Sequence, residues 1–113
     1  AMRILLFIAL LLVVGWLALS PAPPKTMNLG WDKLNHLAAF AALMLSARLA
    51  WPQRPAGWQL FAALLAYGGM IELLQTLVPG RDGEWPDMLA DALGLGLGLL
   101  THAALRRLIV TRT

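Results

Sequence analysis

Four apolar segments occupy most of this chain, and their length limits the folds that it can adopt. A transmembrane helix needs about 20 mainly apolar residues, because each residue advances the helix by about 1.5 Å and the hydrocarbon layer is about 30 Å thick. Hydrophobic residues make up 59% of the chain and charged residues 13%, whereas a soluble domain is about one quarter charged. The sequence therefore predicts an all-α membrane protein. We expect one domain, 1–113, with helices over about residues 4–20, 33–51, 58–78 and 87–110.

The connections between the predicted helices are short and contain helix-breaking residues. Prolines separate the second helix from the third, and Pro79-Gly80 ends the third. Short connections join antiparallel neighbours, so four transmembrane helices predict an up-down-up-down bundle. A cleaved signal peptide is the alternative for the first segment, with Arg3 as its basic flank. Because its apolar run exceeds a usual signal core and prolines follow it, we expect a retained helix.

The basic residues divide unequally between the two sides of this predicted bundle. One side would hold Arg3, Arg48, Arg54, Arg106, Arg107 and Arg112, and the other would hold Lys25, Lys33 and Arg81. Lysine and arginine are enriched in cytoplasmic loops, so we expect both termini in the cytoplasm. All the acidic residues fall at or near the outer side. The net charge of +3 therefore reflects membrane topology and does not indicate nucleic-acid binding.

Three of the predicted helices carry polar side chains at helical spacing in the outer half of the bundle. The pairs are Asp32 with His36, Glu72 with Gln75, and Asp87 with Asp91. Side chains three or four residues apart share a helix face, and ionisable groups avoid lipid. We therefore expect the three polar faces to meet in one layer. Gly94 and Gly98 continue the face of Asp91 as a small-xxx-small pair, which lets a neighbouring helix come close.

The predicted layer carries an excess of negative charge. Its acidic residues are Asp32, Glu72, Asp87 and Asp91, and its basic residues are Lys33 and Arg81. Several carboxylates in a low dielectric cannot all stay ionised. A carboxyl is therefore protonated, His36 is protonated, or a cation or basic ligand group binds. A carboxyl beside a histidine can exchange protons, so we predict His36 and Glu72 as an acid–base pair.

Residues around this pair are predicted to hold a substrate. They are Asp32, Gln75, Arg81, Asp87 and Asp91, with Arg81 as a clamp for an anion. The structural alternatives are that Asp32 and Asp87 cap helices, that Gln75 joins two helices, and that Lys33 is a solvated loop charge. We expect His102, in the inner half, to be a packed or interfacial histidine, and Tyr67 to hydrogen-bond a neighbouring helix. Three buried ionisable residues on three helices favour a site over simple helix association.

Three motifs in this layer resemble those of the VanZ-like family. They are Asp-Lys-x-x-His with Phe40 (Asp32, Lys33, His36), Glu-x-x-Gln before Pro-Gly-Arg (Glu72, Gln75, Pro79, Gly80, Arg81), and Asp-x-x-x-Asp-x-x-Gly-x-x-x-Gly (Asp87, Asp91, Gly94, Gly98). The resemblance covers about residues 32–98. The family commonly has Asn where this chain has Asp91. The resemblance implies a small bacterial inner-membrane protein and a link to resistance to the glycopeptide teicoplanin, and it implies no particular reaction.

From the layer and the resemblance together, we expect a polar pocket, open toward the extracytoplasmic side, that binds or modifies a lipid-linked or amphiphilic envelope molecule. An enzyme would be an acid–base hydrolase or transferase. Because the chain has no cysteine and the layer no serine, its nucleophile would be water or a substrate hydroxyl activated by His36 or Glu72. We predict no cofactor and no metal, since no residue spacing dictates a metal site.

Two other classes of protein fit the same sequence. A small proton-coupled transporter would use one deep glutamate and work as a homodimer, but its polar groups should lie near the midplane rather than in the outer half. A structural subunit of an envelope complex would use the polar layer only to hold its helices together. Substitutions in the layer would then cause misfolding rather than a folded, inactive protein.

Overall fold

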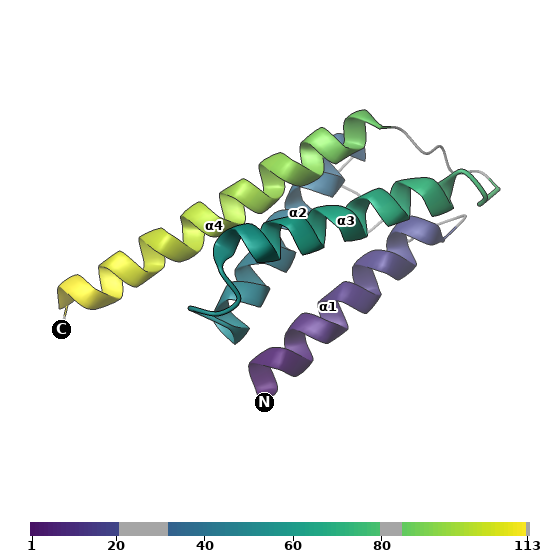
Figure 1. The fold of residues 1–113 in the computed structure, drawn as a ribbon. Coiled ribbons are helices and arrows are strands. Elements are labelled where there is room, and N and C mark those ends of the chain that lie inside the picture. Colours follow the sequence, from purple (N-terminus) through teal and green to yellow (C-terminus); the bar gives the residue numbers. More distant parts are fainter. Residues whose placement is uncertain (21–31, 80–84, 113) are drawn as a thin grey trace.

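The computed structural model describes residues 1–20, 32–79 and 85–112, which form helices and no strand within those ranges. The helices are α1 (Met2–Leu19), α2 (Asp32–Ala50), α3 (Gly57–Gln75) and α4 (Pro86–Arg112). Successive helices run in opposite directions, and both chain ends lie toward the same end of the bundle (Figure 1). The all-α prediction is confirmed for this part of the chain.

Three of the described helices are long and apolar enough to cross a membrane: Met2–Leu19, Gly57–Gln75 and Pro86–Ile109. The second helix, α2, is not among them, because Lys33, His36 and Arg48 lower its hydropathy. It contacts each of the other three helices, and it buries Phe40 and several other apolar side chains. A helix surrounded by three others presents less of its surface to lipid, so it can carry more polar residues.

The most extensive helix packing joins α2 to α4. Two glycines on α4 allow this close approach. A Cβ atom added to Gly94 would meet the carbonyl oxygen of Leu37, and one added to Gly98 would lie 2.6 Å from the Cβ of Met44. No larger side chain fits at these positions without moving the α2 backbone. The predicted role of this glycine pair is confirmed, and the partner helix is α2.

The first helix, α1, packs against α2 and α3 through few specific contacts. The Tyr67 hydroxyl of α3 donates a hydrogen bond of 2.6 Å to the Leu11 carbonyl of α1. Nearer the N-terminus, the rings of Phe7 and Trp51 meet edge to face, with centroids 5.5 Å apart. The predicted interhelical hydrogen bond of Tyr67 is therefore confirmed. About half of the other α1 side chains are apolar and exposed, as expected of side chains that contact lipid.

The helix boundaries differ from the sequence prediction by one to three residues, and a proline explains the difference at two of them. The third helix ends at Gln75 rather than near Val78, because Pro79 has no N–H to donate to the carbonyl of residue 75. The fourth helix begins at Pro86, whose fixed φ suits a first helical position. Asp87 consequently lies inside the first turn and does not occupy the cap position expected for it.

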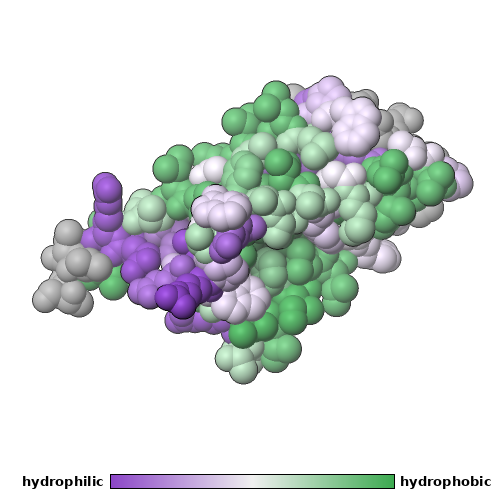
Figure 2. Space-filling model, viewed as in Figure 1, coloured by the Kyte–Doolittle hydropathy of each residue, from purple (hydrophilic) through white to green (hydrophobic). Residues whose placement is uncertain are grey.

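The surface has the apolar character of a membrane protein. Apolar side chains cover much of the visible surface, and hydrophilic ones gather where the C-terminal part of α4 lies beside the α2–α3 connection (Figure 2). Exposed Trp58 and Trp85 lie toward opposite ends of the bundle, as in the two aromatic belts of membrane proteins. Together with the three apolar helices, this distribution indicates a membrane location.

Replacing Gly94 by alanine should destabilise the bundle, because the new methyl group would meet the Leu37 carbonyl oxygen. Overpacking of this kind typically costs about 1–3 kcal/mol. Gly96→Ala is the matched control, since it lies on the same helix and a Cβ there meets nothing within 4 Å. Thermal unfolding in detergent should show a lower midpoint for Gly94→Ala and no decrease for Gly96→Ala. Equal midpoints would contradict the packing of α2 on α4.

Candidate functional site

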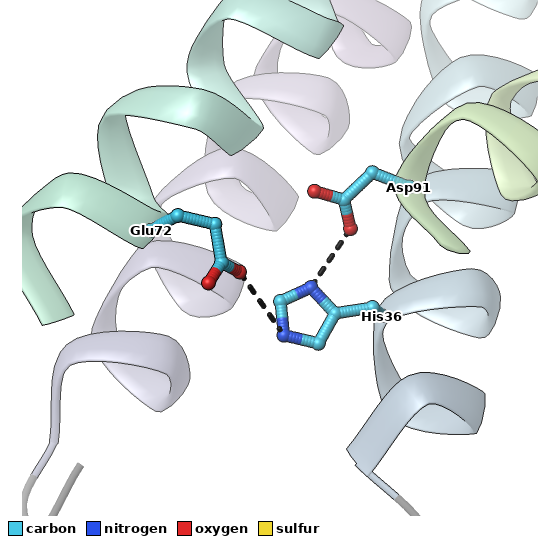
Figure 3. Close-up of side chains that lie close together, drawn as sticks. All are labelled: His36, Glu72 and Asp91. Carbon is cyan, nitrogen blue, oxygen red and sulfur yellow. Dashed lines mark hydrogen bonds and ion pairs between the residues drawn. The ribbon is translucent and has the colours of Figure 1, made fainter. Parts of the chain in front are cut away.

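The histidine of α2 is the centre of a buried polar cluster. His36 Nδ1 lies 2.8 Å from Asp91 Oδ1, within hydrogen-bonding distance. Its Nε2 atom lies 3.6 Å from Glu72 Oε1 and 3.5 Å from Asp87 Oδ2. Figure 3 shows the imidazole between the carboxyl groups of Glu72 and Asp91, which come from different helices. We call His36, Glu72, Asp87 and Asp91 the polar layer.

Helix geometry brings the polar layer together. Asp87 and Asp91 are four residues apart on α4, so both face α2, which runs parallel to α4 and carries His36. Glu72 reaches the same imidazole from the last turn of α3. The exposed fractions of His36, Glu72, Asp87 and Asp91 are 9%, 1%, 0% and 0%. The predicted meeting of the polar faces therefore occurs for these four residues.

A lysine completes the electrostatics of the layer. Lys33 Nζ lies 3.4 Å from Asp87 Oδ1. The exposed fraction of the lysine side chain is 33%. The interpretation of Lys33 as a solvated loop charge is wrong, because Lys33 belongs to the first turn of α2 and faces α4. The three carboxyl groups and the imidazole of the polar layer thus lie beside one ammonium group. Their burial means that the charges must be balanced by protonation or by ion pairing.

The two nitrogens of His36 have different surroundings, which defines what the ring can do. If Nδ1 carries the proton, Asp91 accepts it in a hydrogen bond and fixes the ring orientation. Nε2 then faces Glu72 and Asp87 with a lone pair or a second proton. A carboxylate that orients a histidine while the opposite nitrogen exchanges a proton is a recurrent arrangement in acid–base catalysis. The layer can therefore store and transfer protons.

The same residues could also hold a metal ion. His36, Glu72 and Asp91 each offer one ligand atom, and these atoms lie within 4.8 Å of one another. One imidazole nitrogen and two carboxylate oxygens suit divalent transition metals such as zinc or manganese. Asp91 would have to exchange its hydrogen bond with His36 for a bond to the metal. The expectation of no metal stays a prediction.

Other predicted site residues have different positions. Gln75 is buried, and its Nε2 atom donates a 2.8 Å hydrogen bond to the Ala18 carbonyl of α1, as expected of a residue that joins two helices. Asp32 is the first residue of α2, and its side chain is outside the described part of the structure. Arg81, the predicted anion clamp, also lies outside the described residues. His102 is buried in α4, away from the layer, as expected.

Sequence reasoning missed the contribution of Gly68 to the layer. A Cβ atom at this position of α3 would lie 2.5 Å from Asp91 Oδ2 and 3.1 Å from Phe40 Cζ. The glycine therefore leaves room for the Asp91 carboxyl beside α3. Gly68 is four residues before Glu72 and so shares its helix face, which is the signal that could have identified it.

The fold and the polar layer define a class of helical membrane proteins with buried acidic and histidine residues. A family model described as VanZ/LLP1 matches residues 3–106, which is nearly the whole chain. The chain therefore belongs to the VanZ/LLP1 family, and the resemblance found in its three motifs is confirmed. The match also includes α1, which those motifs did not cover. No curated protein and no solved structure matches the chain significantly.

A double-mutant cycle should detect coupling between Lys33 and Asp87. Lys33→Met leaves a buried carboxyl without its ammonium partner, and Asp87→Asn removes the charge that the ammonium pairs with. Contacting charged residues typically couple by about 0.5–3 kcal/mol. Unfolding free energies in detergent should therefore be non-additive, with the double variant more stable than the sum of the single effects predicts. Additive effects would mean that this ion pair does not form.

Proposed function

We propose that the polar layer is a working acid–base site that acts on or binds a lipid-linked or amphiphilic molecule of the cell envelope. The observation that carries this proposal is the position of His36. Asp91 lies against one ring nitrogen at 2.8 Å, and two further carboxyl groups from α3 and α4 face the other. A layer used only for helix association would need hydrogen bonds, but it would not need three carboxyl groups around one imidazole.

In this proposal, all four helices cross the inner membrane of a bacterium and both termini are cytoplasmic. The polar layer would then lie in the extracytoplasmic half. The distribution of charge supports this orientation, because Arg48, Arg54 and Arg106 lie toward the end of the bundle opposite the layer. Arginine and lysine are enriched on the cytoplasmic side of membrane proteins. The alternating directions of the four helices agree with four crossings (Figure 1).

The chemistry of the proposed site would be proton transfer. His36 Nε2 would accept a proton from water or from a substrate hydroxyl, and Glu72 would supply or receive the second proton. Asp91 would hold the ring, and Lys33 would stabilise negative charge on Asp87. A substrate with an apolar part is proposed because it could approach the layer through the bilayer. Association with teicoplanin resistance follows from the resemblance and belongs to the same proposal.

The burial of the layer favours a structural role as the second candidate function. Glu72, Asp87 and Asp91 are almost completely buried, and Gln75 of the same α3 face joins α3 to α1. A structural layer would serve a subunit of a larger envelope complex. The proton-coupled transporter has less support, because the buried ionisable residues of the described chain lie near one end of the bundle, except for His102.

Teicoplanin susceptibility of a sensitive host tests this proposal. Cells would express the wild-type protein, Glu72→Gln, His36→Ala or the control Thr101→Ala, which changes an exposed residue of α4 away from the layer. We expect wild type and Thr101→Ala to raise the inhibitory concentration. Glu72→Gln and His36→Ala should return it to that of cells without the protein, because each removes one proton-transfer group.

Membrane abundance and thermal stability of each variant separate the two candidate functions. Folded and abundant variants that fail to protect support a working site. Folded variants that still protect would show that the polar layer is not the site, and variants that misfold would support the structural role. If the wild-type protein gives no protection, the proposed association with teicoplanin resistance is wrong.

A further inference from the structure

A groove lies at the end of the bundle opposite the polar layer, between α2 and α4. Its volume is about 370 Å³. It is lined by Arg48, Pro52, Leu99, His102, Ala103 and Arg106. His102 is eleven residues after Asp91 on α4, so about 16 Å of helix separates the groove from the polar layer. The hydrophilic surface seen where α4 lies beside the α2–α3 connection surrounds this region (Figure 2). We call it the basic groove.

The charge of the basic groove has one sign. Two arginines, Arg48 and Arg106, are among its lining residues, and no acidic residue is among them. The buried carboxyl groups of Glu72, Asp87 and Asp91 all lie in the polar layer instead. A concave surface with uncompensated positive charge attracts anions, and apolar walls strengthen that attraction by lowering the local dielectric.

One arginine is held in place before any ligand binds. Arg48 Nη1 donates hydrogen bonds of 3.2 Å to the Trp51 carbonyl and 2.8 Å to the Pro55 carbonyl. These bonds fix the guanidinium group beside the α2–α3 connection, while its remaining N–H groups can bind an anion. A guanidinium group matches two oxygens of a phosphate at once. A preorganised side chain also loses less entropy on binding.

The apolar residues of the groove indicate an amphiphilic ligand rather than a free anion. Leu99 and Ala103 line one side, and the nearby Leu100 and Leu105 of α4 are exposed toward the surroundings. Trp58, which is also exposed, marks this end as a membrane interface. Basic pockets between transmembrane helices at the cytoplasmic interface are suited to phospholipid head groups.

We propose that the basic groove binds the phosphodiester head group of an anionic phospholipid; the assignment of that lipid to the cytoplasmic leaflet rests on the membrane orientation proposed above. The phosphate lies between Arg48 and Arg106, beside His102, and the acyl chains extend along the exposed apolar face of α4. The site is separate from the polar layer, and its existence does not depend on the chemistry proposed for His36. It gives the protein a second lipid contact, at the opposite membrane interface.

The experiment is a lipid titration of the purified full chain in detergent, at about 0.15 M salt so that exposed charges beyond about 8 Å are screened. The midpoint of thermal unfolding is measured against added phosphatidylglycerol, phosphatidylcholine or inorganic phosphate. Arg106→Gln removes one lining arginine. Arg54→Gln is the matched control, because it removes the same charge from an exposed residue at the same end of the bundle, outside the groove.

We expect phosphatidylglycerol to raise the unfolding midpoint of wild type and of Arg54→Gln at similar concentrations. Arg106→Gln should need about fivefold more of this lipid, the effect of one basic residue at an anionic surface. Phosphatidylcholine and inorganic phosphate should produce little shift. Equal responses of Arg106→Gln and Arg54→Gln would overturn the proposal in favour of unspecific attraction. An equal shift with inorganic phosphate would replace the lipid by a free anion, and an equal shift with phosphatidylcholine would show that charge does not select the ligand.

If Arg106→Gln does not fold, Arg48→Gln provides the second test. Because Arg48→Gln also removes the hydrogen bonds to the Trp51 and Pro55 carbonyls, its unfolding midpoint without lipid is measured first. A folded Arg48→Gln that responds to phosphatidylglycerol like wild type would likewise overturn the proposed site. Teicoplanin protection by Arg106→Gln is measured in parallel. Weaker lipid binding with normal protection would separate this groove from the function proposed for the polar layer.

Discussion

The polar layer depends on the contact between α2 and α4, where His36 lies 2.8 Å from Asp91. A buried carboxyl or imidazole without its partner would lower the free energy of unfolding by several kcal/mol. Each of the two residues can therefore be buried only because the other is present. Gly94 permits the contact, because its missing side chain leaves space for the α2 backbone. Once α2 and α4 are in register, Asp87 comes beside Nε2 of the same ring, and α3 adds Glu72.

Much of this arrangement could be predicted from the sequence because two simple rules apply in a membrane. Helical spacing fixes which side chains share a face, and the avoidance of lipid by ionisable groups turns those faces inward. These rules placed His36, Glu72 and Asp91 in one layer. They did not reveal that Lys33 pairs with Asp87, or that Gly68 makes room for Asp91, since both depend on how far each helix is rotated about its axis. Helix spacing alone does not fix that rotation.

The second helix shows why the apolar character of a single segment does not by itself identify every helix of a membrane bundle. It carries the central histidine and contacts the three other helices, yet among the helices of the described residues it alone is not apolar enough to count as a candidate membrane span. Its polar residues interact with the rest of the bundle, and Arg48 at its other end contributes to the basic groove. The helix that is least suited to lipid thus connects the polar layer with the basic groove at the opposite end of the bundle.

The most direct test of the central claim is nitrogen NMR of the histidine side chains in lipid bilayers. The claim is that Asp91 holds His36 through Nδ1 in a buried layer. We predict a protonated, hydrogen-bonded Nδ1 on His36, and a change in both His36 nitrogen signals when Asp91 is replaced by Asn. His102 should keep its signals and serves as the internal reference, because it lies about 16 Å along α4 from Asp91. His36 signals that do not respond to Asp91→Asn would contradict the claim.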